Sequence, residues 1–261
     1  KEFKLTKFGK SESYLLRCLY LMKEKSLFYN QLDNLINQGE INAMIGSLCS
    51  RSALKYGIEK TNLFCKNPMK YVLNVNLKNK YDFKKVFVDT AMAILTEDRL
   101  PYREQSLLTN GRQTSGNLFN YKYDFIPEIE KIIRDEIDNY RYKHRHSDEG
   151  LIKKWPNDYI VSGWLISMKS GSQIRPHMHE KGWISGSIYI NVPPKINSDN
   201  GNLVVCIEDE EFVEKKIKNP KKVINVITGS LALFPASLLH YTIPFISEEE
   251  RVVLAFDIIP K

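Results

Sequence analysis

The sequence has few of the residues that define several classes of protein. Its 261 residues include only 4 cysteines, at spacings that match neither a zinc-ligand pairing nor a disulfide framework. The 13 Gly and 11 Pro are too few for a collagen-like or low-complexity chain. No apolar run approaches the roughly 18 residues of a membrane helix, and the first ten residues lack the apolar centre of a secretory signal. These absences predict a globular, cytoplasmic protein with no membrane segment.

Charge is distributed unevenly along the chain. The net charge is +7, and residues 1–157 hold 27 Lys and Arg against 19 Asp and Glu, whereas residues 158–261 hold 11 against 12. The basic part has no Gly/Arg tract and no dense Lys run interleaved with aromatic residues, which are typical of nucleic-acid binding. A solvated helical surface is the simpler interpretation, so we expect no nucleic-acid partner.

Hydrophobic periodicity divides the chain into a helical part and a strand-rich part. Residues 1–60 predict three antiparallel helices, as at the end of a helical-repeat array, and the first should bury Leu15, Leu19 and Met22. Residues 61–157 predict a mixed, mainly helical segment that packs on the next domain. Residues 158–261 contain short alternating segments rich in Val, Ile and aromatic residues. The predicted class is α+β, with helices followed by a jelly-roll barrel.

Three of the five histidines have a spacing that suits metal binding. His177 and His179 are two residues apart, so in a strand they project to the same side, and His240 lies near the start of a later strand. Neutral imidazoles are good ligands for Fe, Zn, Cu and Ni. The sequence therefore predicts one metal site with these three ligands. The other pair, His144 and His146, closes a basic helix, where protonated histidine would complement the helix dipole.

Arg251 begins a later apolar segment, RVVLAFDI, eleven residues after His240. Strand alternation places Arg251 on the same face as Val253 and Ala255. If that face points into a barrel, the guanidinium needs an anionic partner, which a dicarboxylate could provide through a bidentate contact. The alternatives are a salt bridge to one of the glutamates at 248–250 or exposure at the start of the strand.

The order of these segments resembles a known family. SGSQIRPHMH, WISGSIYINVP, GSLALFPASLLH and then Arg251 resemble the 2-oxoglutarate and Fe(II)-dependent oxygenases, in particular a bacterial and phage branch with His-x-His before Ser-Gly-x-x-Tyr-Tyr. The resemblance covers the barrel, TNGRQTSGNLF resembles an upstream segment of that branch, and some members carry tetratricopeptide-type helices. It implies a double-stranded β-helix, Fe(II) and 2-oxoglutarate as cofactors, and hydroxylase activity.

The resemblance also implies roles for individual residues. His177 corresponds to the first metal ligand, His240 to the distal ligand, and Arg251 to the clamp on the 5-carboxylate of 2-oxoglutarate. Tyr189, which shares a strand face with Ser187, is expected to help hold the same cosubstrate. A peptide or protein side chain is the preferred substrate, with a small molecule as the alternative, because helical repeats offer extended concave surfaces. The candidate substrate contacts are Gln113, Thr114 and Trp183.

Position 179 departs from the usual family pattern, which has Asp or Glu two residues after the first histidine. Either His179 is the third ligand, or Glu180 turns inward, or the metal has only two protein ligands. Glu180 would project to the opposite side of a regular strand, so His179 is preferred.

Two other interpretations remain open from the sequence. The cupins are also similar, since Gly171 before His177-x-His179 resembles their first motif and GSLALFPASLLH resembles their second, although the glutamate of the first is missing. That resemblance implies a metal dioxygenase or isomerase without a cosubstrate. The last interpretation is a non-catalytic interaction module with a degenerate barrel.

Overall fold

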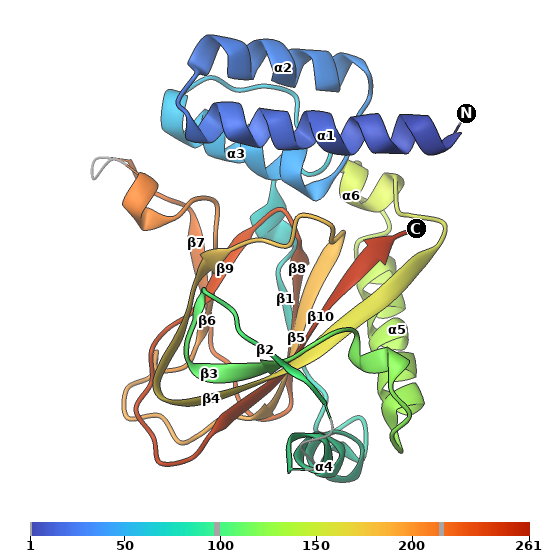
Figure 1. Cartoon of the computed structure of the whole chain (residues 1–261), viewed down its shortest axis with the longest axis vertical. Helices are drawn as coiled ribbons and strands as arrows, with labels where there is room; N and C mark the ends of the chain where they lie inside the picture. Colours follow the sequence, from blue (N-terminus) through green and yellow to red (C-terminus); the bar gives the residue numbers. More distant parts are fainter. Residues whose placement is uncertain (1, 97–99, 214–216) are drawn as a thin grey trace.

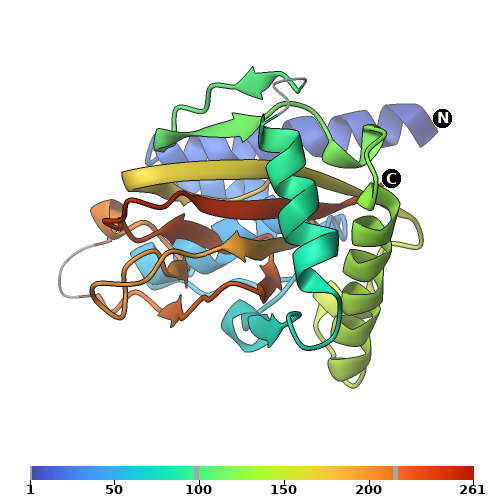
Figure 2. The same ribbon diagram turned by 90° about the horizontal axis from the view of Figure 1, so that it is seen from below.

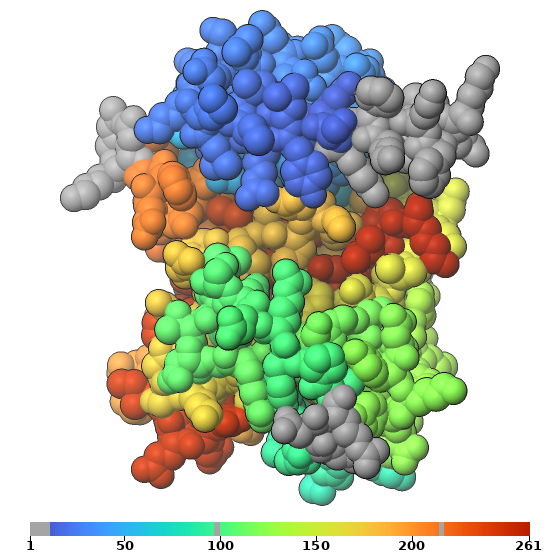
Figure 3. Space-filling model, in the orientation of Figure 1, coloured from blue at the N-terminus to red at the C-terminus, as the bar shows by residue number. Residues whose placement is uncertain are grey.

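The computed structural model describes residues 2–96, 100–213 and 217–261, with side chains from residue 11 onward. Three helices begin the chain, α1 (Glu2–Leu21), α2 (Lys25–Asn37) and α3 (Ala43–Tyr56), and they form a layer across one end of the barrel (Figure 1). The space-filling view shows the same layer resting on the barrel (Figure 3). Within the described ranges, no helix has the length and apolar character that crossing a membrane requires.

The middle segment contains several short helices, one long helix and three strands. In order these elements are η1 (Pro68–Tyr71), β1 (Leu73–Asn76), η2 (Lys84–Asp89), α4 (Thr90–Thr96), β2 (Tyr102–Arg103), β3 (Leu108–Thr114), η3 (Leu118–Asn120), α5 (Ile126–Lys143) and α6 (Gly150–Lys153). The remaining elements are β4 (Tyr159–His177), β5 (Ile184–Asn191), β6 (Leu203–Cys206), η4 (Glu210–Phe212), β7 (Lys221–Ile224), β8 (Ser230–Pro235), β9 (Leu239–Thr242) and β10 (Arg251–Pro260).

Eight strands curl into a nearly closed antiparallel barrel. They pair in the order β1-β8-β5-β10-β4-β9-β6-β7, while β3 adds to β4 and β2 pairs with β3. This arrangement is the predicted double-stranded β-helix, and with the helices it confirms the α+β class. Helices α4 and α5 cover one outer side of the sheet (Figure 2). Because β1 and β3 come from the middle segment, that segment forms part of the sheet in addition to packing on it.

The buried face predicted for α1 is wrong for two of its three residues, and the third, Leu19, is partly buried against the core of the helical layer. Leu16 and Tyr20 are buried, whereas Leu15 and Met22 are 49% and 68% exposed. The segment YLLRCLYLM has apolar residues on two adjacent helical stripes, so its own period does not choose between them. Contacts with α2 and α3 select the stripe that contains Leu16 and Tyr20.

The interpretation of α5 was correct for its core face and wrong for the histidine that follows it. The four isoleucines predicted to face one way are all buried: Ile126, Ile129, Ile133 and Ile137. His144, however, lies against the rings of Tyr71 and Tyr140, with centroids 4.8 Å away in each case. Burial, followed by the charge of Lys143, lowers the pKa of His144. Partial burial therefore outweighs the attraction of the helix end for a protonated imidazole.

A buried carboxylate fastens the helical layer to the barrel. Glu208, just after β6, is 1% exposed, accepts a 2.6 Å hydrogen bond from the Tyr20 hydroxyl of α1, and forms a 2.7 Å ion pair with Arg51 of α3. Burial, with the neighbouring Glu208 charge, raises the pKa of the Tyr20 hydroxyl. Breaking this ion pair would leave the Glu208 charge buried without a partner, which strongly destabilises a protein. The pair therefore holds the helices against the barrel mouth.

Replacing Arg51 by Met is expected to destabilise the protein by about 3–5 kcal/mol, because Glu208 would remain buried without its cation. Denaturant unfolding measures this change. Lys131→Met removes an exposed i,i+4 ion pair with Asp135 and should leave the free energy of unfolding nearly unchanged. Adding Glu208→Gln to Arg51→Met should restore part of the loss. Equal costs for the two single variants would show that the buried pair does not fasten the helical layer.

Candidate active site

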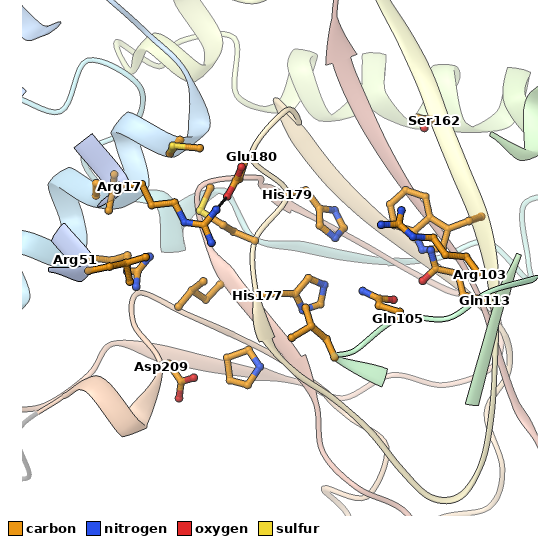
Figure 4. A pocket seen from close by; sticks show the side chains of 18 of the residues that line it. Arg17, Arg51, Arg103, Gln105, Gln113, Ser162, His177, His179, Glu180 and Asp209 are labelled. Atoms are coloured by element: carbon orange, nitrogen blue, oxygen red, sulfur yellow. Dashed lines mark hydrogen bonds and ion pairs between the residues drawn. The ribbon is translucent and has the colours of Figure 1, made fainter. Parts of the chain in front are cut away.

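Strand pairing brings the three predicted histidines together at the barrel mouth. His177 on β4 is the register partner of His240 on β9, and His179 follows two residues beyond His177. The ligand atoms of the three side chains all lie within 4.8 Å of one another. His177 and His179 project into the same space in Figure 4. Three imidazole nitrogens at this separation fit a first-row transition metal such as iron.

Hydrogen bonds orient two of the imidazoles for this role. The Nδ1 atom of His177 donates to the Arg175 carbonyl at 2.8 Å, which leaves Nε2 with a free lone pair. The Nδ1 atom of His179 lies 2.7 Å from the Asp257 carboxylate, so its Nε2 is again the free nitrogen. The alternative hypothesis, in which Glu180 turns inward as the third ligand, does not fit this structure. Glu180 instead forms an ion pair with Arg17 of α1 (Figure 4).

The electrostatic environment differs among the three rings. Burial, and then the neighbouring His179, lowers the pKa of His177 to about 4. Burial and the adjacent His177 likewise depress the pKa of His240 far below its ordinary value. For His179, burial acts in the same direction, but the Asp257 charge and hydrogen bond outweigh it and raise the pKa. The rings of His177 and His240 therefore lose their protons at lower pH than the ring of His179 does.

At a pH below the raised pKa of His179, metal binding should release about one proton from that imidazole. A protonated imidazole cannot be a ligand, so below the raised pKa of His179 the metal affinity should fall about tenfold per pH unit as the pH decreases. Titration calorimetry with Co(II) in two buffers of different ionisation enthalpy measures the proton count. His179→Ala should abolish the release, and a pH-independent affinity in the unaltered protein would contradict the prediction.

A small inner cavity of about 40 Å³ adjoins the histidines and contains Arg251. Arg251 is 2% exposed, lies over the Tyr189 ring at 5.0 Å, and donates to the Met168 sulfur at 3.2 Å. Its Nε atom is buried without a hydrogen-bond partner. Ser187 also lines this cavity, and burial raises the pKa of Tyr189 to about 12, against the opposing influence of Arg251. The strand-face prediction for Arg251 is confirmed.

The guanidinium of Arg251 has no anionic partner in the described part of the chain. The glutamates just before β10 do not pair with it, and Glu250 instead accepts a hydrogen bond from Ser167. A buried, unpaired cation is costly unless a ligand neutralises it. The inner cavity therefore fits the terminal carboxylate of a dicarboxylate such as 2-oxoglutarate.

A larger outer cleft of about 620 Å³ opens above the histidines, with the barrel on one side and the helical layer on the other (Figure 4). Gln113 and Thr114 of β3 line it, and the Gln113 amide oxygen is buried without a partner. The Thr114 hydroxyl has a structural role, because it accepts a 3.0 Å hydrogen bond from the backbone N–H of Leu165. The 109–119 segment, predicted as a loop or hairpin, is thus largely strand β3 paired with β2 and β4.

The candidate substrate role of Trp183 was wrong. Trp183 is 5% exposed, belongs to the apolar core, packs edge-on against Phe64 at 4.9 Å, and donates its indole N–H to the Leu151 carbonyl. Its aromatic surface contributes to packing instead of lining the cleft. Asp257 was not among the residues predicted from the sequence, although the alternation that places Arg251 inward places Asp257 on the same face of β10.

Comparisons with known proteins agree with this geometry. Residues 162–257 match the family profile described as "Putative 2OG-Fe(II) oxygenase". No curated protein matches the sequence. A prolyl-4-hydroxylase structure from Pseudomonas putida is similar with a TM-score of 0.51 at 11% identity, over 83% of this chain and 99% of that chain. The epimerase SnoN from nogalamycin biosynthesis gives 0.52 at 9% identity, over 72% and 76%.

The structural likenesses are too distant in sequence to show more than a shared fold. The matching profile, however, spans β5, β6, β7, β8 and β9 and most of β4 and β10, and so contains all three histidines and Arg251. Fe(II) and 2-oxoglutarate are the cofactors typical of that family, and the histidine cluster and buried guanidinium fit them. Residues 162–257 are therefore similar to the 2-oxoglutarate and Fe(II)-dependent oxygenases, and the barrel and the histidine cluster agree with that match.

Proposed function

We propose that this chain is a 2-oxoglutarate-dependent oxygenase that hydroxylates a peptide or protein side chain, with Fe(II) held by His177, His179 and His240. In this proposal Arg251 pairs with the 5-carboxylate of 2-oxoglutarate, and Tyr189 and Ser187 line the same end of the cavity. The single observation that carries the cosubstrate assignment is the unpaired Arg251 guanidinium, buried beside the histidine cluster. A cupin-like enzyme without a cosubstrate, or a non-catalytic module, would leave that charge uncompensated.

When bound, Fe(II) and 2-oxoglutarate supply the family's chemistry: the cosubstrate loses CO₂ to become succinate, which takes one oxygen atom of O₂, and the other becomes the product hydroxyl. The protein's own part is to orient the metal ligands and the cosubstrate and to shield the cavity from water. His177 is fixed by the Arg175 carbonyl, and Arg251 sets the direction in which the cosubstrate lies. Apolar side chains around the inner cavity limit access of water, namely Ile166, Ile174, Leu203, Phe234, Val253 and Ala255.

The outer cleft supports a polypeptide substrate. Its helical wall combines two arginines with apolar side chains, a mixture that suits a peptide backbone with varied side chains; these residues are Arg17, Leu21, Met44, Leu48 and Arg51. On the barrel wall, Gln113 and Arg103 line the cleft, and Arg103 is exposed. A prolyl-4-hydroxylase shares the fold, so this barrel is compatible with hydroxylation of an amino-acid residue.

The oxygenase proposal is tested by adding 2-oxoglutarate anaerobically to the Fe(II)-loaded protein and recording the visible spectrum. A charge-transfer band that saturates with the cosubstrate is expected. A folded, iron-loaded sample without such a band would refute the cosubstrate assignment.

The substrate class is tested separately, by measuring succinate formation in air with a peptide library and with a small-molecule library. Peptides should stimulate succinate formation and gain one oxygen atom by mass spectrometry. Arg103→Ala should raise the peptide KM and leave the anaerobic band unchanged. Stimulation by small molecules alone would refute the peptide proposal.

A further inference from the structure

An acidic residue behind the histidine cluster has no part in the function proposed above. Asp257 on β10 is 6% exposed, and its Oδ1 atom lies 2.7 Å from Nδ1 of His179. The same oxygen accepts a 2.7 Å hydrogen bond from the Ser185 hydroxyl of β5. Ser185 is 1% exposed and also lies 3.3 Å from Nδ1 of His179.

The two strands place this pair by register. Asp257 is the direct cross-strand partner of Ser185, just as Ala255 is the partner of Ser187. Side chains two residues apart share a face, so Asp257 and Arg251 lie on the same inward face of β10. One strand therefore carries a cation at the cosubstrate end of the cavity and an anion behind the metal cluster.

His179 needs such support more than the other histidines do. It lies just beyond the end of β4, where the chain turns towards β5, so no strand hydrogen-bond ladder fixes its direction. His177, in contrast, is within β4, and its ring is held by a backbone carbonyl two residues away. The Asp257 contact is the shorter of the two side-chain hydrogen bonds at Nδ1 of His179, and its carboxylate acceptor sets the ring orientation and the tautomer.

We propose that Asp257, held in place by Ser185, is a positioning residue that turns the Nε2 atom of His179 toward the metal and supplies the site's negative charge from behind that ligand. In most of the superfamily a carboxylate at the position of His179 would bring that charge into direct contact with the metal. Here it would act through the imidazole, which a hydrogen-bonded carboxylate makes a stronger electron donor. This inference rests on the ligand role proposed for His179.

The experiment measures Co(II) dissociation constants for the whole chain, without reference to turnover. Asp257→Asn keeps the shape and an acceptor oxygen but removes the charge, and should raise the constant about 10–100-fold. Ser185→Ala should raise it less, by under about tenfold. The matched control is Glu136→Gln, which removes the charge of another buried carboxylate, 3% exposed, on α5. It should leave Co(II) binding unchanged.

A double-mutant cycle separates positioning from a purely structural role. If Asp257 acts through His179, then Asp257→Asn should have no further effect on Co(II) binding in a His179→Ala background. Additive losses, or equal constants for Asp257→Asn and Glu136→Gln, would overturn the inference. Should Asp257→Asn fail to fold, Ser185→Ala in both backgrounds gives the same comparison. A wild-type protein that binds no Co(II) would instead refute the metal site itself.

Discussion

Replacing His240 by alanine is expected to reduce Fe(II) affinity by at least about 1,000-fold and to remove oxygenase activity. Loss of a group behind a metal ligand typically costs about 10–100-fold, and loss of the ligand itself must cost more. His240 is also the register partner of His177, so its removal leaves one side of the cluster without a donor. Metal content after dialysis against a weak chelator, together with succinate formation, measures the effect.

The chain contains its own matched control for that substitution. His146→Ala removes an exposed histidine that lies outside the cluster, and it should retain full metal content. His177→Ala should resemble His240→Ala, since the two rings lie 4.3 Å apart between centroids. Comparable iron in all four proteins, with native circular dichroism, would show that the histidine cluster is not the metal site.

Replacing Arg251 by leucine is expected to raise the dissociation constant for 2-oxoglutarate by at least about 100-fold, while Fe(II) binding stays unchanged. A bidentate pair between a guanidinium and a carboxylate is worth several kcal/mol when it is desolvated, and about 1.4 kcal/mol corresponds to a factor of ten. Arg251 is fully enclosed beside Tyr189, so water cannot replace the lost contact. Anaerobic titration of the charge-transfer band gives the constant.

In the absence of cosubstrate, Arg251→Leu should not lower the free energy of unfolding, and it should raise that free energy by up to about 4 kcal/mol. Arg251 is a buried charge with no ion pair, so an apolar side chain of similar volume removes a desolvation cost. Arg103→Leu, which alters the outer cleft only, should leave cosubstrate affinity unchanged. Retention of wild-type cosubstrate affinity by Arg251→Leu would refute the clamp, and a large loss of stability would indicate a structural role.

Local pattern was enough to predict the fold class and the cluster of three histidines. Alternation with period two predicted the strands and placed Arg251 on an inward face of β10, whereas His179 lies beyond the end of β4 and is oriented by Asp257. These predictions hold because side-chain direction in a strand is fixed by the backbone, whatever the strand packs against. The predictions for α1 and Trp183 were wrong for a different reason. Each concerned which of several apolar surfaces would be buried, and packing against other elements decides that.

What the sequence determined by itself was the set of donors and charges: three imidazoles, one guanidinium and the strands that carry them. Only the tertiary structure decided their partners. Glu180 is held by Arg17 from α1, and Asp257 reaches His179 across 78 residues of sequence. Such pairings depend on strand register and on how the helical layer docks, which are set by long-range contacts. No local period of the chain encodes them.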